Sequence, residues 1–192
     1  MGSAPGWPGS GPAVSAPGER HAQWAGKTLA ELVADQARTR PHAIAVLDAH
    51  QALTYAELWA RAAHLATDLR RVGQAPGRLI GVWGERNTDL LVHLVGVLAA
   101  ESAYVALEPT YPQARLSHVA RSAGLEMVLG GPPAFLDTVG AGDRRAAVTP
   151  AQEPYLGADG AGSDDSGETT AREPDDRSLA YVMFTSGSTG QP

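Results

Sequence analysis

Hydroxyl side chains alternate with glycines near the C-terminal end of the sequence, directly after an apolar stretch. The stretch, residues 178–184, has the composition of a buried strand, and the run that follows is Thr185-Ser186-Gly187-Ser188-Thr189-Gly190. Glycine lets backbone N–H groups approach an anion without a Cβ in the way, and hydroxyls add further donors. α/β sheets bind ligands just beyond the carboxyl ends of parallel strands. This hydroxyl–glycine run therefore predicts a loop that holds phosphate or polyphosphate, while composition alone equally permits a polar tail.

Two common phosphate loops and one nucleophile motif do not fit these residues. A Walker A loop needs a lysine after its second glycine, and Lys27 is the only lysine in the sequence. Gly187 and Gly190 do not supply the G-x-G-x-x-G of a dinucleotide-binding turn. Ser186 is not a G-x-S-x-G nucleophile, because Thr185 stands where that motif has glycine.

Composition narrows the class of protein. The chain has 192 residues, enough for one domain or most of one, and no cysteine, which excludes a disulfide scaffold and thiolate chemistry and predicts a cytoplasmic protein. Its net charge of -6 argues against nucleic-acid binding. No segment has the pattern of a signal peptide or a membrane span. The six histidines are scattered and predict no metal site.

The N-terminal part of the sequence changes character after about residue 26. Residues 1–26 are rich in Gly, Pro, Ser and Ala, which predicts a disordered tail. Thr28 and Glu31 form a capping-box pattern for a helix that ends before Pro41. Two short strands, 43–48 and 52–55, flank a turn at 49–51. A second capping box, Thr54 with Glu57, opens a long helix to about residue 72.

Strands and helices then alternate along the chain. The pattern predicts strands at 78–84, 103–107 and 125–130, separated by helices at 88–100 and 113–123. Such alternation indicates βαβ units, so the predicted fold class is α/β with a mainly parallel sheet and flanking helices. Among the side chains in these elements, Tyr104 and Trp83 are expected in the core, and His93 against it.

A long acidic segment interrupts this alternation near residues 140–177. Between residues 159 and 177 there are seven acidic residues and two arginines, a net charge of -5. This composition predicts a disordered insertion or linker. A cation site built from the acidic side chains is an alternative, although no ordered ligand spacing supports it.

Three motifs, in order, resemble those of the adenylate-forming enzymes, and in particular the amino-acid adenylation domains of nonribosomal peptide synthetases. They are "LTYAEL" at 53–58, "VLAAESAYVALEPTYPQARL" at 97–116 and "LAYVMFTSGSTGQP" at 179–192. The third motif is shared with acyl-CoA ligases and luciferases, and the second favours amino-acid adenylation. Ala99, Ala100 and Glu101 replace the family's Lys-Ala-Gly, while Ala106 and Glu108 replace its Pro and Asp. In the family these positions shape the fold and do not perform the reaction, so the replacements are expected to affect packing more than catalysis.

The resemblance implies an N-terminal, truncated portion of a larger adenylating enzyme, spanning residues 27–192. Such enzymes join a carboxylate to ATP with Mg²⁺, release pyrophosphate, and pass the acyl group to a phosphopantetheine thiol on a carrier domain. In that scheme the cofactor-binding residues are Thr185, Ser186, Gly187, Ser188, Thr189 and Gly190. No catalytic residue is present, because the family's lysines are expected beyond Pro192, so the isolated chain is expected to be inactive. The alternatives are a non-catalytic remnant or interaction module, and a fragment of an acyl-CoA ligase-type enzyme.

Overall fold

The first helix begins where its capping residues predict. The structure is a computed structural model and describes residues 26–139 and 178–184. Helix α1 (Leu29–Thr39) starts after Thr28, whose hydroxyl accepts the N–H of Glu31, while the Glu31 carboxylate accepts the N–H of Thr28. This reciprocal capping satisfies two N–H groups that have no partner within the helix. The predicted start of the helix is confirmed.

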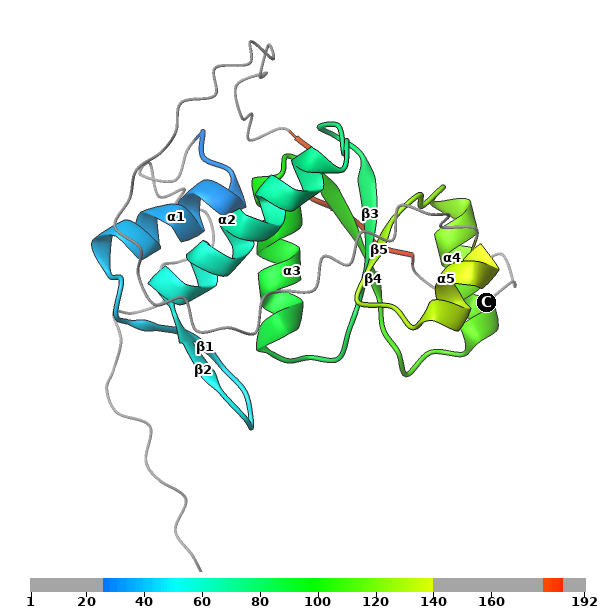
Figure 1. Cartoon of the computed structure of the whole chain (residues 1–192), viewed down its shortest axis with the longest axis horizontal. Coiled ribbons are helices and arrows are strands. Elements are labelled where there is room, and N and C mark those ends of the chain that lie inside the picture. The colour runs from blue at the N-terminus through cyan, green and yellow to red at the C-terminus, as the bar shows by residue number, and fades with distance from the viewer. Residues whose placement is uncertain (1–25, 140–177, 185–192) are drawn as a thin grey trace, which may run out of the picture.

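A β-hairpin leads from α1 into the longest helix. Strands β1 (Ile44–Leu47) and β2 (Ala52–Thr54) pair antiparallel. Helix α2 (Tyr55–Arg71) follows directly, with Thr54 and Glu57 forming the second predicted capping box. Figure 1 shows the hairpin projecting from the body of the molecule below α1 and α2.

The central sheet has the parallel arrangement that the alternating pattern predicts. Its strands are β3 (Leu79–Trp83), β4 (Ala103–Leu107), β5 (Val128–Leu129) and β6 (Tyr181–Val182). They lie in the order β5-β3-β4-β6, and each neighbouring pair is parallel. The carboxyl ends of all four strands therefore meet at one edge of the sheet.

Helices cover the sheet on both faces (Figure 1). Helices α2 and α3 (Thr88–Ala99) pack on one face, whereas α4 (Gln113–Ser122) and α5 (Pro133–Val139) lie on the other. Each face has its own apolar cluster, and burial of this apolar surface is the main stabilising contribution. The α2–α3 cluster consists of Leu65, Ala66, Leu69, Ile80, Val82, Val97, Ala100, Met127 and Leu129. The α4–α5 cluster consists of Val105, Leu107, Leu116, Val119, Ala120, Leu125 and Phe135.

Three sequence predictions differ from the structure. Helix α5 was not predicted, and β5 and β6 are only two residues long. The prediction that residues 178–184 form a buried strand is wrong, because Tyr181 is 50% exposed and Met183 is 73% exposed. Within the described residues β6 pairs only with β4, so nothing in that part of the chain covers its outer side.

Other predictions concern residues that the structure does not describe. The predicted disordered tail lies outside the described residues except for Gly26, which is exposed, and the predicted acidic insertion at 140–177 lies outside them entirely. The helices in the described ranges are all too short or too polar to cross a membrane.

Three helices end in a turn with a left-handed residue, although one of them lacks the usual glycine. Helices α2 and α4 are followed by Gly73 (φ 79°) and Gly124 (φ 61°), in the left-handed region. Helix α3 is followed by Glu101 at φ 58°. Its N–H donates to the Leu98 carbonyl (3.0 Å) and the next N–H, of Ser102, donates to Val97 (3.1 Å), which completes a Schellman motif. Glu101 therefore adopts a backbone conformation that favours glycine.

Replacing Glu101 with glycine is expected to stabilise the protein. A side chain in the left-handed region costs roughly 1–2 kcal/mol, which the change to glycine recovers. Because the unfolded chain is more flexible at a glycine, about 0.5–1 kcal/mol of this gain is lost again. The net increase in the free energy of unfolding should be about 0.5–1 kcal/mol, measured by urea denaturation. The control Glu101→Gln removes the charge but keeps the Cβ, and an equal gain in this control would show that backbone strain is not the cause.

Candidate functional site

The hydroxyl–glycine run predicted to bind phosphate lies outside the described residues, but the strand that leads into it is described. Strand β6 runs parallel to β4 and ends at Val182. The described chain continues to Phe184, immediately before Thr185. Because β6 is parallel to its neighbours, the chain arrives at the carboxyl edge of the sheet, the edge at which α/β proteins bind ligands.

Strand β6 is held to the sheet by few contacts. The N–H of Tyr104 donates to the carbonyl of Ala180 at 3.1 Å, and the rings of Tyr104 and Tyr181 stack with centroids 5.6 Å apart and planes at 22°. Tyr104 is half-buried, and burial raises the pKa of its hydroxyl, with a smaller contribution from Tyr181. On the opposite face, Val182 packs against the α4–α5 cluster.

Two arginines lie in the segments that follow β3 and β4. Arg86 Nε lies 3.8 Å from Glu108 Oε2, which links the two segments. The guanidinium of Arg115 lies 4.3 Å from the ring centroid of Tyr111, close enough for a cation–π contact. The Arg86 side chain is 89% exposed, so its ion pair contributes little to stability.

The turn of the β1–β2 hairpin is fastened to the start of α3. Asp48 Oδ2 accepts the N–H of Thr88 at 2.9 Å, while Oδ1 accepts the N–H groups of His50 (2.7 Å) and Gln51 (2.9 Å). Gln51 Nε2 also donates to Thr88 Oγ1 at 2.6 Å. These backbone hydrogen bonds, the one from Thr88 first, hold the pKa of Asp48 far below its ordinary value. The sequence predicted the turn but not the bond to Thr88, although an aspartate opening a turn is a recognised signal for local bonds.

His93 is a buried polar side chain on α3. Only 6% of the residue is exposed, and its Nε2 has no hydrogen-bond partner among the described residues. Burial lowers the pKa of His93, and the nearby carboxylate of Asp89 opposes this only in part. The prediction that His93 lies against the core is confirmed, and its burial favours the neutral form of the imidazole.

His93 is expected to make the fold sensitive to acid. Because its pKa is lower in the folded state than the ordinary value of 6.5, the unfolded chain takes up a proton first as the pH falls. Above pH 6.5 the histidine is neutral in both the folded and the unfolded chain and does not change the free energy of unfolding. As the pH falls from 6.5 toward the lowered pKa, the free energy of unfolding decreases. In chemical denaturation between about pH 7.5 and pH 5, the free energy of unfolding of His93→Leu should fall less steeply with decreasing pH than that of the wild type. The difference in slope should be up to about 1.4 kcal/mol per pH unit. The control His42→Leu, at an exposed position, should keep the wild-type slope, and an unchanged slope in His93→Leu would contradict the assignment.

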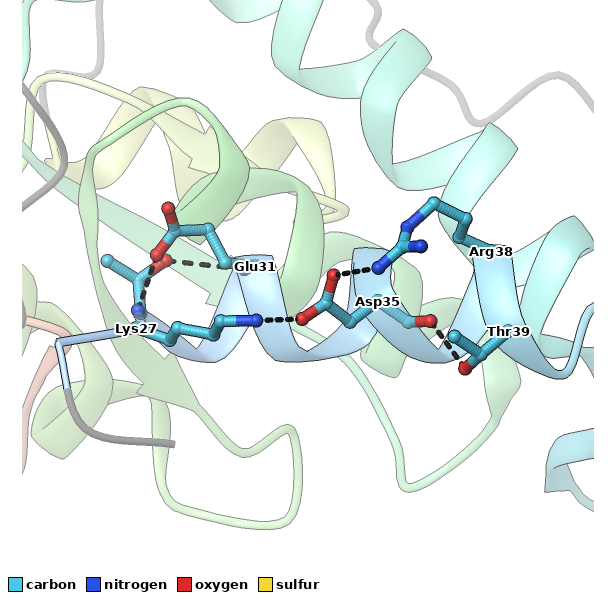
Figure 2. Close-up of polar contacts among 6 residues, drawn as sticks. Lys27, Glu31, Asp35, Arg38 and Thr39 are labelled. Carbon is cyan, nitrogen blue, oxygen red and sulfur yellow. Dashed lines mark hydrogen bonds and ion pairs between the residues drawn. The ribbon is translucent and has the colours of Figure 1, made fainter. Parts of the chain in front are cut away.

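The single lysine is engaged on the surface of α1. Figure 2 shows Lys27 Nζ paired with one carboxylate oxygen of Asp35 and Arg38 paired with the other, at 3.1 Å for Arg38. The pair with Lys27 first, and then the pair with Arg38, lowers the pKa of Asp35. Within the described ranges, no group of three or more histidine, aspartate or glutamate side chains is placed to hold a metal ion.

Comparisons with known proteins agree with the motifs. A family model described as AMP-binding enzyme matches residues 33–192. Gramicidin S synthase 2 of Brevibacillus brevis is 34% identical over 166 residues, which are 86% of this chain and 4% of the synthase. Syringomycin synthase SyrB1 of Pseudomonas syringae pv. syringae is 34% identical over 171 residues, 87% of this chain and 26% of that protein.

A solved structure extends the comparison to the fold. The nonribosomal peptide synthetase FmoA3, crystallised with α-methyl-L-serine-AMP bound, superposes with a TM-score of 0.53 at 35% identity. The superposition covers 55% of this chain and 12% of the FmoA3 chain. The chain thus spans only a small part of the length of each of these relatives.

Proposed function

The chain belongs to the family of AMP-binding, adenylate-forming enzymes, and from this premise we propose that it contributes the phosphate-binding loop of a domain that adenylates an amino acid. In the proposed reaction an amino-acid carboxylate attacks the α-phosphate of ATP, pyrophosphate leaves, and an aminoacyl-AMP forms. The acyl group then passes to the phosphopantetheine thiol of a carrier domain, with release of AMP.

The observation that carries the proposal is the position of β6, which is separated by two residues from the start of the hydroxyl–glycine run. This strand belongs to a parallel sheet and directs the chain to the carboxyl edge. Backbone N–H groups and hydroxyls of Thr185, Ser186, Ser188 and Thr189 are proposed to hold the β- and γ-phosphates, and so to stabilise the charge on the departing pyrophosphate. Gly187 and Gly190 would let the backbone come close to those phosphates.

Other parts of the chemistry are assigned to groups outside this chain's own residues. Lys27 is paired with Asp35 on α1, so a lysine that stabilises transferred charge is proposed to come from polypeptide outside these 192 residues. Mg²⁺ is proposed to enter with ATP through phosphate oxygens, its preferred type of ligand. FmoA3, with an aminoacyl-AMP in its crystal structure, supports an amino acid as the class of substrate.

The test is exchange of labelled pyrophosphate into ATP, which reports formation and reversal of the adenylate. The native protein that carries these 192 residues should catalyse exchange that depends on an added amino acid. The 192 residues alone should give none. Exchange that depends on a fatty or aryl acid would favour the acyl-CoA ligase class, and a complete lack of exchange with a broad panel of acids would favour the non-catalytic alternative.

A further inference from the structure

Strand β6 has little to fix its register along β4. Within residues 178–184 two residues pair with β4, Tyr181 with Tyr104 and Val182 with Val105. Among the described residues most of its neighbourhood is open, because Leu179, Tyr181 and Met183 are each at least half exposed. Register is set mainly by which side chains must be buried and by cross-strand side-chain pairs, so a short exposed strand is weakly specified.

The contact between Tyr104 and Tyr181 adds a cross-strand side-chain pair that depends on the register of β6. Tyr104 is the fixed member, because it lies within β4 and packs against the α2–α3 cluster. Tyr181 is the exposed member and stacks on it at 5.6 Å. A slip of one residue would move β6 by about 3.3 Å and turn the Tyr181 ring to the opposite face, where it would lose Tyr104. It would also remove Val182 from the α4–α5 cluster on that face.

The register of β6 matters because Thr185 lies four residues after Tyr181. A displacement of the strand would also move Phe184, the last described residue before the hydroxyl–glycine run. Misplacement of a binding group by about 1 Å can lower a rate by about a hundredfold. We propose that Tyr104 is a positioning residue, which acts through the Tyr181 ring to set the register of β6 and so to place the hydroxyl–glycine run for ATP. This inference rests on the proposed function for its consequence, but not for the register itself.

The register is tested on the 192-residue chain by hydrogen exchange. Tyr104→Leu keeps an apolar side chain but removes the ring, and it should speed amide exchange in residues 178–184 by about tenfold or more. Tyr104→Phe keeps the stack and should exchange like the wild type. Tyr111→Leu is the matched control, because Tyr111 contacts Arg115 rather than β6. Unchanged exchange in Tyr104→Leu would overturn the proposal whatever the run binds.

Tyr181→Leu tests the same contact through the exposed ring. Because Tyr181 is half exposed, its replacement is not expected to unfold the protein. It should reproduce the faster exchange of Tyr104→Leu while the thermal unfolding midpoint of the chain stays within a few degrees of the wild type. Slow exchange in Tyr181→Leu would mean that the stack does not hold β6, and would also overturn the proposal.

The consequence for the run is tested by amino-acid-dependent pyrophosphate exchange in the native protein. Tyr104→Leu and Tyr181→Leu should each lower kcat/KM for ATP by about 10- to 100-fold, with KM for the amino acid unchanged, and Tyr104→Phe should restore the wild-type value. Because the two rings act through one contact, the double variant should lose no more than either single variant. Losses that multiply, or that match the loss of folded protein, would overturn the positioning role. Absence of exchange in the wild type would instead count against the proposed function, and the hydrogen-exchange result would still decide the register.

Discussion

Replacing Gly187 with valine should lower amino-acid-dependent pyrophosphate exchange by at least about 100-fold in the protein that carries the activity. Gly187 stands between Ser186 and Ser188 in the hydroxyl–glycine run, where we propose that the backbone approaches the phosphates of ATP. A valine side chain would occupy the space that the backbone needs to reach the ligand, and its branched Cβ also disfavours positive φ angles. The kinetic parameters for ATP and pyrophosphate should change, whereas KM for the amino acid should not.

The control for this prediction is Gly160→Val, a glycine-to-valine change in the acidic segment, outside the three matched motifs. It should leave exchange within about twofold of the wild type. Removing one hydroxyl, as in Thr185→Ala or Ser186→Ala, should have an intermediate effect. Loss of a hydrogen bond to a charged group costs about 1.5–3 kcal/mol, which is roughly a 10- to 100-fold loss in rate. An active protein in which Gly187→Val exchanges normally would show that the run does not hold the phosphates.

Helices α1 to α4 were predictable because their signals are local. The capping box of Thr54 and Glu57 lies within four residues of sequence, and the structure contains both of its hydrogen bonds. The stripe that begins at Leu58 recurs at helical spacing and is buried along α2, through Ala62, Leu65 and Leu69. Neither signal depends on what packs nearby, so tertiary contacts did not change the local structure that the sequence predicts.

Strand lengths and strand exposure were less predictable, because they depend on neighbours. The apolar composition of residues 178–184 suggested a buried strand, but burial needs a second partner or a covering layer. In the described structure β6 has β4 on one side only. Helix α5 was missed because its seven residues are too few to show a helical period, and it forms by packing Phe135 into the α4–α5 cluster.

The candidate site also has one part that the sequence predicts, a contiguous motif, and another that it does not, the contacts between distant residues. The hydroxyl–glycine run is a contiguous motif, so it can be predicted from the sequence alone, and its role in binding phosphate stays a prediction. The long-range contacts in the described part of the chain join residues that are distant in the sequence. Asp48 bonds to Thr88 across 40 positions, and Tyr104 stacks on Tyr181 from another strand. Single-sequence patterns carry no signal for such pairs, since each residue taken alone is equally consistent with a turn or a core position.

Replacing Gly130 with alanine should be among the most destabilising single changes in the chain. Gly130 follows β5 at φ 77°, and a Cβ there would lie 2.6 Å from the carbonyl oxygen of Trp83. That oxygen belongs to the backbone of β3, which is paired with β4 and β5 on its two sides and has no freedom to retreat. The left-handed conformation costs alanine a net of about 0.5–1 kcal/mol after the lower entropy of its unfolded chain is subtracted, and overpacking adds about 1–3 kcal/mol. The expected loss of about 1.5–4 kcal/mol is a large part of the stability of a typical domain.

Gly124→Ala separates the two causes. Gly124 has a similar backbone conformation, at φ 61°, but a Cβ built there has no heavy atom within 4 Å. Its replacement should therefore cost only the conformational part, about 0.5–1 kcal/mol once the lower entropy of the unfolded alanine chain is subtracted. Urea denaturation of the two variants gives the difference directly, and that difference measures the contact with Trp83. Equal losses in the two variants would mean that β3 and the segment after β5 can separate without cost, and that the carboxyl edge of the sheet is not held as closely as the structure describes.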